Sequence, residues 1–343
     1  MKHFPLMGKE RQRLVCNQTG AQLNLEEVAV EKDFWVCWTL DKLFRLPQWG
    51  DNITFKGGTS LSKGWKLIAR FSEDIDIVID RDALGFGGKT KPETAPSKKQ
   101  TKKRLGALRD ACRQCVAESI LPLLKAALSA DIPTGKVWDL IIDKLDPDNQ
   151  TLLFNYPSVF DEQAKYLKRT VKIEMGARSD TEPVESIKIR PYISEVFPYL
   201  LSSPEVEVRA VSPVRTFWEK AMLLHEESYR PNADNRFKTY MARHYYDLYQ
   251  LIRAGIAEKA AADLELFKRI KEHRMIFFRY TWLDYDSVKP STLRLVPTET
   301  QMPNWRTDYT NMQQELFFGE IPTFDEIIDK VRRFQEEFNE KNL

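Results

Sequence analysis

The sequence is poor in cysteine, in long apolar runs and in net charge. Its four cysteines are too few and too scattered for a disulfide framework, so a reducing compartment, the cytoplasm, is expected. No stretch approaches the ~20 apolar residues that span a bilayer, and the opening MKHFPLMGKERQRL lacks a signal-peptide core. Secretion and membrane insertion are therefore not expected. The formal net charge is only +2, so attraction for nucleic acid must come from local basic clusters.

What is present indicates a soluble protein with two domains. Hydrophobic residues make up 42% of the chain and charged residues 30%, as in ordinary globular proteins. Its 343 residues suit one large domain or two modest ones. The pattern of apolar residues changes from strand-like to helical near Pro213. We therefore predict an α/β domain at 1–212 and a helical domain at 213–343. The strand-like stretches are 151–154, 167–175, 186–192 and 205–211.

The segment before residue 105 carries most of the chemistry. Apolar spacing predicts a helix over 25–44, whose aromatic residues belong to the core rather than to a base-stacking platform. These residues are Phe34, Trp35, Trp38 and Phe44. A strand over 52–56, a Gly-Gly turn, a helix over 59–70 and a strand over 74–80 follow. Residues 85–104 are rich in glycine, proline and lysine, which predicts a flexible loop. Its basic part, 98–104, either contacts RNA phosphates or is simply solvated.

Two acids share one face of the predicted strand over 74–80. Asp74 and Asp76 stand two residues apart among isoleucines, in FSEDIDIVID, so both side chains point the same way. Carboxylates so placed can hold Mg²⁺ or Mn²⁺ against the phosphates of a nucleoside triphosphate. Glu174, on another predicted strand, is the candidate third metal ligand.

A glycine turn precedes the acid pair by one predicted helix. In GGTSLSK, glycines without a Cβ let backbone N–H groups approach phosphate oxygens, and a helix start favours the anion. We therefore assign nucleotide binding to five residues of this segment, Gly57, Gly58, Thr59, Ser60 and Lys63. An alternating acid pair alone is common on surface strands, but its combination with this turn favours function.

These motifs resemble those of the AbiEii/AbiGii-type nucleotidyltransferase toxins. The resemblance starts from Gly57–Ser60 and from SEDID and extends to VEKDFWVCWTLDKLF, RTFWEKAMLLHE, RHYYDLYQL, TWLDYD and LRLVP. It implies an α+β fold, with a polymerase-β-like nucleotidyltransferase lobe followed by a mainly helical C-terminal lobe. It also implies a cognate antitoxin, often a winged-helix repressor, and in some members transfer of nucleotides to the 3′ end of tRNA.

The resemblance adds two site residues that composition would not have selected. The family's metal acids fall on Asp74 and Asp76, its lysine on Lys220 and its later aspartate on Asp247. Lys220 would act on triphosphate charge, and Asp247 would either orient that lysine or act as a base. A lysine and an aspartate on amphipathic helices are otherwise most often solvated.

Three functions remain open from the sequence. The first is a toxin that transfers a nucleoside monophosphate to a hydroxyl acceptor, the tRNA 3′ end, and so inhibits growth. The second keeps this chemistry but modifies a protein or a small molecule. The third is an inactive nucleotide-binding protein that acts through a partner.

Overall fold

A computed structural model describes residues 1, 3–70, 72, 74–160, 169–231, 239–317 and 321–342. The chain forms two compact units. The first contains Met1–Gly64 and Ser72–Ala210, and the second contains Trp65–Phe71 and Val211–Leu343. The segment 65–71 thus belongs to the second unit although the first unit precedes and follows it.

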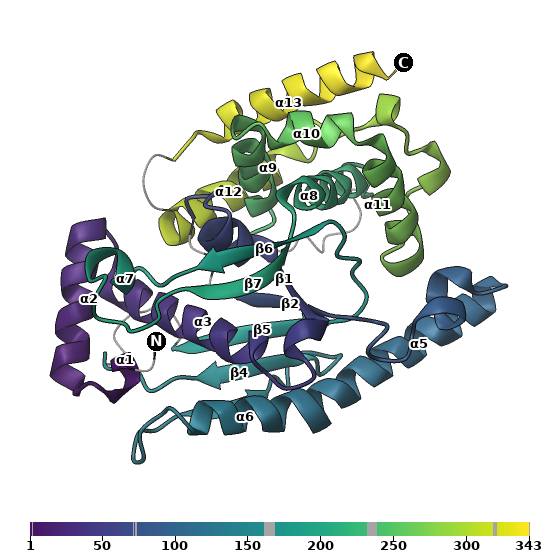
Figure 1. The fold of residues 1–343 in the computed structure, drawn as a ribbon. Helices are drawn as coiled ribbons and strands as arrows, with labels where there is room; N and C mark the ends of the chain where they lie inside the picture. The colour runs from purple at the N-terminus through teal and green to yellow at the C-terminus, as the bar shows by residue number, and fades with distance from the viewer. Residues whose placement is uncertain are drawn as a thin grey trace. The chain divides into compact units, whose positions relative to one another are not determined.

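A mixed sheet is the scaffold of the first unit. Its strand order is β3-β4-β5-β2-β1-β7-β6 (Figure 1). β2 lies between β1, which is antiparallel to it, and β5, which is parallel. Buried and partly exposed residues alternate along β5, so one side of this strand is apolar and the other polar. The strands are β1 (Ile53–Lys56), β2 (Ile75–Ile79), β3 (Asp139–Ile142), β4 (Thr151–Asn155), β5 (Thr170–Gly176), β6 (Val184–Ile189) and β7 (Val206–Val211).

Helix α3 supplies much of the core of this unit. Trp35 and Trp38 of α3 are fully buried, and the Trp35 ring stacks on Tyr156 with centroids 5.6 Å apart. Together with the fully buried Phe34, these residues confirm the predicted core of the 25–44 helix. Phe44, the last residue of α3, is only partly buried and was wrongly assigned to the core. The helices of the first unit are α1 (His3–Leu6), α2 (Lys9–Leu23), α3 (Glu27–Phe44), α4 (Gly57–Thr59), the π-helical η2 (Ser60–Gly64), α5 (Lys98–Cys115), the π-helical η5 (Val116–Ile120), α6 (Leu121–Ser129) and α7 (Ile193–Val196). Short 3₁₀ turns are η1 (Gly50–Asn52), η3 (Gly88–Thr90) and η4 (Pro92–Thr94).

The second unit is mainly helical in its described parts. Its core is aromatic: the Trp218 ring contacts Phe267 at 5.0 Å and Phe338 at 5.1 Å between centroids. None of the helices described in either unit is long and apolar enough to cross a membrane. The helices are α8 (Pro213–Ser228), α9 (Arg243–Arg253), α10 (Ile256–Ala262), α11 (Leu264–Phe277), α12 (Met302–Leu316) and α13 (Phe324–Lys341), with 3₁₀ turns η6 (Tyr285–Ser287) and η7 (Pro290–Thr292). Sheet and helices together confirm the predicted α+β fold class.

The predicted helix over 59–70 was wrong beyond residue 64. Helical structure ends at Gly64, and Lys66 adopts a left-handed conformation with φ 54°. Ala69 N then donates to the Tyr246 hydroxyl at 3.3 Å, and Arg70 forms an antiparallel bridge with Phe317. Tertiary hydrogen bonds within the second unit therefore override the local helical preference of this segment.

The predicted loop over 85–104 was wrong at its C-terminal end. Residues from Lys98 onward form α5, which begins after Ser97, whose Oγ accepts a hydrogen bond from Gln100 N at 3.3 Å. A serine cap followed by lysine and glutamine, which are good helix formers, explains the difference. The predicted strand over 167–175 begins at Thr170 in the structure, and residues 167 and 168 lie outside the described part.

Candidate active site

Asp76 lies directly against the glycine turn. β1 runs into α4 at Gly57, and Lys56 at the end of β1 pairs in register with Asp76 on β2. Gly57 has φ +80°, and a Cβ at this position would stand 1.8 Å from Asp76 Oδ2. Only glycine fits here, both because of the left-handed backbone and because the carboxylate occupies the space of a side chain.

A methyl group at Gly57 is expected to displace the Asp76 carboxylate. If the chain has the nucleotidyltransferase activity that the resemblance implies, Gly57→Ala should lower that transfer by roughly a hundredfold, the size of effect that a displacement of about 1 Å at a reacting group can have. Gly85→Ala is the matched control, since Gly85 shares the positive φ (+83°) but has open space around it. Both variants carry a backbone strain of about 1–3 kcal/mol, measurable by thermal unfolding. Equal transfer rates for the two would contradict the fit between Gly57 and Asp76.

The Thr59 and Ser60 hydroxyl groups of the turn form hydrogen bonds within the first unit. Thr59 Oγ1 donates to Asp74 O at 2.5 Å and lies 3.0 Å from Ser72 Oγ, and Ser60 Oγ donates to Gly57 O at 2.9 Å. Both side chains are fully buried. In this arrangement Thr59 fixes the backbone that carries Asp74, and Ser60 fixes the shape of the turn.

The acids lie on the face of the sheet where β5 carries its polar side chains. Asp76 on β2 is in register with Glu174 on the parallel strand β5, so the two side chains lie on the same face. Asp74 precedes β2 by one residue and shares this face. Asp74 and Asp76 are both partly exposed. The oxygen donors of the pair suit a hard cation such as Mg²⁺.

Lys172 is a charged neighbour that sequence reasoning missed. Its ammonium is paired with the Glu174 carboxylate, and although burial alone would lower it, the pKa of Lys172 is raised by Glu174 and, more weakly, by Asp74. Within the described residues no three acidic, histidine or cysteine side chains are already gathered as a metal site. Glu174 would have to leave Lys172 to complete one. The alternation of polar residues along β5 was the signal that could have identified Lys172.

Lys63, in η2 directly after the glycine turn, is buried. Its Nζ lies 2.6 Å from Asp33 Oδ1 of α3 and 3.4 Å from the centroid of the Tyr192 ring. Burial opposes the charge, but the Asp33 carboxylate outweighs it and raises the pKa of Lys63. Tyr192 N donates to Asp33 Oδ2 at 2.7 Å. The ion pair between Lys63 and Asp33 therefore connects η2 to α3 and stabilises the segment that follows the glycine turn.

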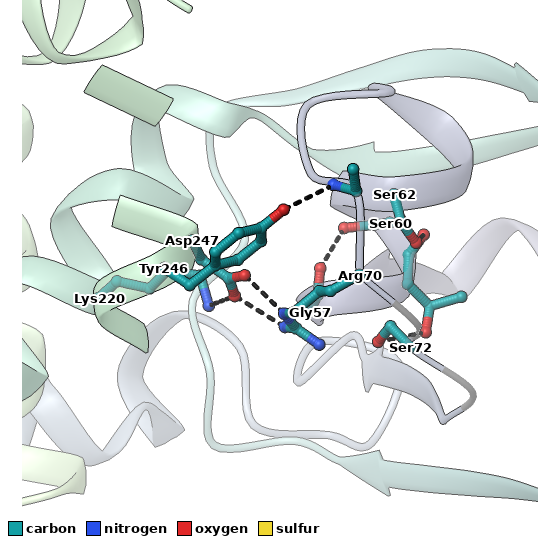
Figure 2. A network of polar contacts seen from close by, with 10 residues as sticks. Gly57, Ser60, Ser62, Arg70, Ser72, Lys220, Tyr246 and Asp247 are labelled. Carbon is teal, nitrogen blue, oxygen red and sulfur yellow. Dashed lines mark hydrogen bonds and ion pairs between the residues drawn. The ribbon is translucent and has the colours of Figure 1, made fainter. Parts of the chain in front are cut away.

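Asp247 organises a buried charge cluster in the second unit. Figure 2 shows the Arg70 guanidinium and the Lys220 ammonium both directed at its carboxylate. Arg70 Nε and Nη2 donate to Oδ1 and Oδ2 at 2.7 and 2.8 Å, and Lys220 Nζ donates to Oδ2 at 2.7 Å. Asp247 is fully buried. Such a two-point arginine contact is among the strongest and most geometrically specific hydrogen-bonded pairs in proteins.

The charges of this cluster shift one another's protonation. Burial would raise the pKa of Asp247, but Arg70 and Lys220 hold it well below its usual range. The pKa of Lys220 is lowered, because burial and the Arg70 charge outweigh the attraction of Asp247. The neighbouring His244 has a strongly lowered pKa through burial and the Lys220 and Arg243 charges. Lys220 is therefore the titratable cation of the cluster.

The predicted site residues thus fall into two groups. Gly57, Gly58, Thr59, Ser60, Lys63, Asp74, Asp76 and Glu174 belong to the first unit, and Lys220 and Asp247 belong to the second. Within the second unit Lys220 and Asp247 are in direct contact, whereas Arg70 completes their cluster and was not predicted. Arg70 stands four residues before Asp74 in RFSED, which was the available sequence signal.

Comparison with known proteins gives one family. The family model described as nucleotidyl transferase AbiEii toxin, type IV toxin–antitoxin system, matches residues 38–330. Among solved structures, the chain is similar to MenT4, a nucleotidyltransferase toxin from Mycobacterium tuberculosis H37Rv, with 16% sequence identity and a TM-score of 0.39. This similarity covers 98% of this chain and 99% of that one. A search of the curated proteins finds none that matches.

Proposed function

Because this chain belongs to the AbiEii family of nucleotidyltransferase toxins of type IV toxin–antitoxin systems, we propose that it transfers a nucleoside monophosphate from a nucleoside triphosphate to a hydroxyl group at the 3′ end of tRNA. The observation that carries the proposal is the close approach of the Asp76 carboxylate to Gly57, at the end of β1. This contact supports the proposal because a carboxylate, which is a suitable ligand for a hard cation, lies beside a turn whose backbone N–H groups suit phosphate oxygens.

In the reaction, the acceptor oxygen forms a bond to the α-phosphorus while the bond from that phosphorus to the bridging oxygen breaks. Pyrophosphate leaves, and the hydroxyl proton passes to solvent water. Asp74 and Asp76 would hold Mg²⁺ or Mn²⁺, which when bound neutralises phosphate charge. Glu174 would be the third ligand. The backbone of Gly57 and Gly58 would meet phosphate oxygens, while the Thr59 and Ser60 hydroxyls keep the turn in shape.

For the second unit we propose one acting residue and one positioning residue. Lys220 would stabilise the charge that develops on the triphosphate. Asp247 has both carboxylate oxygens occupied and is fully buried, and a carboxylate with a depressed pKa is a poor base. These facts favour the orienting role of Asp247 over the role of a base.

Removal of the divalent cation is expected to stop transfer. Two carboxylates on one strand face repel each other and a triphosphate unless a cation lies between them. Excess chelator should lower pyrophosphate release by at least about a hundredfold, a loss of roughly 3 kcal/mol in transition-state stabilisation. Added Mg²⁺ or Mn²⁺ should restore it. Transfer that persists after thorough chelation would contradict the metal role of Asp74 and Asp76.

The acceptor is tested by incubating the protein with each labelled nucleoside triphosphate and total cell RNA. Label at the 3′ end of tRNA supports the proposal, and label on protein or on a small molecule would replace tRNA as the acceptor. Nucleotide binding without any labelled product would favour an inactive protein that acts through a partner. The family implies a cognate antitoxin, which we propose to be a winged-helix protein.

A further inference from the structure

A dense group of positive charge stands at the start of α5. The first residues of this helix are KKQTKKR, and α5 as a whole has seven basic residues against one acid, Asp110. Lys98, Lys99, Lys102 and Lys103 are all exposed; we call these four the basic tip. Within the described part of the chain, none of their ammonium groups is ion-paired. The overall charge of +2 conceals this concentration.

The tip is electrostatically unfavourable in the free protein. Lys98 and Lys102 are four residues apart on the helix, as are Lys99 and Lys103, and like charges at this spacing destabilise a helix. The buried residues of α5 are Leu108, Cys112 and Cys115, all beyond its first two turns. Hydrophobic packing therefore does not offset the repulsion among the tip lysines, whereas a polyanion would.

The tip is nevertheless held in place. Arg104 Nη1 donates to Lys91 O at 2.6 Å and to Thr94 Oγ1 at 3.2 Å. Arg81, two residues beyond β2, pairs with Glu93 at 2.6 Å. These contacts brace the start of α5 against the loop that leaves the strand of Asp76. Figure 1 shows α5 projecting outward past the strands of the sheet, with its N-terminal end farthest from α6.

We propose that the basic tip binds the phosphate backbone of the acceptor RNA, an inference that rests on the proposed function. Exposed lysines on a braced, projecting helix suit the phosphates of an RNA longer than the nucleotide being modified. An acidic protein is a poorer fit, because the centres of protein interfaces are depleted of lysine and enriched in aromatic residues and methionine. The first seven residues of α5 contain no apolar side chain.

The test compares two fourfold Lys→Gln variants with the wild-type protein. One replaces the basic tip, and the control replaces the exposed Lys259, Lys268, Lys330 and Lys341, with the same change in net charge. The probe is a fluorescent RNA hairpin with a single-stranded 3′ end, and binding is measured by anisotropy over a range of salt concentrations without nucleoside triphosphate. Each lost phosphate contact reduces the salt slope by about 0.7–0.9.

We expect the tip variant to bind RNA at least about tenfold more weakly and to lose about 2–3 from its salt slope, while the control binds as wild type. Unchanged RNA binding by the tip variant would overturn the proposal, and so would equal losses in both variants. Loss of antitoxin binding with RNA binding intact would make the tip a protein contact and equally overturn it. If tip-dependent RNA binding occurs but no RNA is ever labelled, the tip assignment stands and the proposed acceptor fails.

Discussion

Replacing Asp76 with alanine is expected to abolish nucleotide transfer while leaving the protein folded. The change removes a proposed metal ligand, and such a ligand supports several kcal/mol of transition-state stabilisation, so we expect transfer to fall by roughly a thousandfold or more. Stability should change little, because Asp76 is only partly buried and the apolar face of β2 keeps Ile75 and Ile77. Expression of this variant without the antitoxin should no longer inhibit growth.

Asp80→Ala is the matched control for this experiment. Asp80 lies on the same side of the chain, just past the end of β2 and about 13 Å beyond Asp76 at the usual strand rise. It is exposed, and its Oδ1 accepts a hydrogen bond from Asp82 N at 2.9 Å. Loss of that bond should lower stability by about 0.5–1.5 kcal/mol and leave transfer near normal. If both folded variants transfer equally well, Asp74 and Asp76 are ordinary surface acids and the proposed site fails.

The spacing of apolar residues along the chain predicted those helices and strands whose formation depends mainly on neighbouring residues. The helix over 25–44 and the strand around Asp76 could be predicted because amphipathic spacing and strict alternation are carried by neighbouring residues. The start of α5 also had a local signal, the serine cap at Ser97, which accepts a hydrogen bond from Gln100 N. The glycine- and proline-rich sequence before it led us to predict a loop instead.

Arg70 could not be predicted in this way. Its guanidinium pairs with a carboxylate 177 residues away, and its extended backbone is fixed by tertiary bonds against a helical local preference. The contact between Lys220 and Asp247, 27 residues apart, was likewise beyond local periodicity and came only from the family resemblance. For Lys63 the local motif was misleading. Its place in GGTSLSK predicted that it binds phosphate, whereas its ammonium is buried in an ion pair with Asp33.

Substitutions in the cluster around Asp247 are expected to affect stability and activity separately. In Lys220→Met the Asp247 carboxylate keeps its two-point contact with Arg70, so the protein should fold while transfer falls by about a hundredfold or more. Lys220→Arg should not restore transfer, because a planar guanidinium replaces a compact ammonium. Asp247→Asn instead leaves two buried cations without their counter-charge and should lower the free energy of unfolding by about 3–5 kcal/mol.

The pH dependence of transfer distinguishes positioning by Asp247 from a purely structural role. If the Lys220 ammonium is required, activity is present below its pKa and is lost as the pH rises through it. That pKa is already lowered by burial and by Arg70, and Asp247 opposes the decrease. Removing the carboxylate should therefore lower the pKa of Lys220 further, so the alkaline limb of the pH–rate profile should move to lower pH in Asp247→Asn. His244 is neutral in this range because its pKa lies well below its usual value, and arginine does not titrate there. An alkaline limb at the same pH in wild type and in folded Asp247→Asn would show that Asp247 does not act through Lys220.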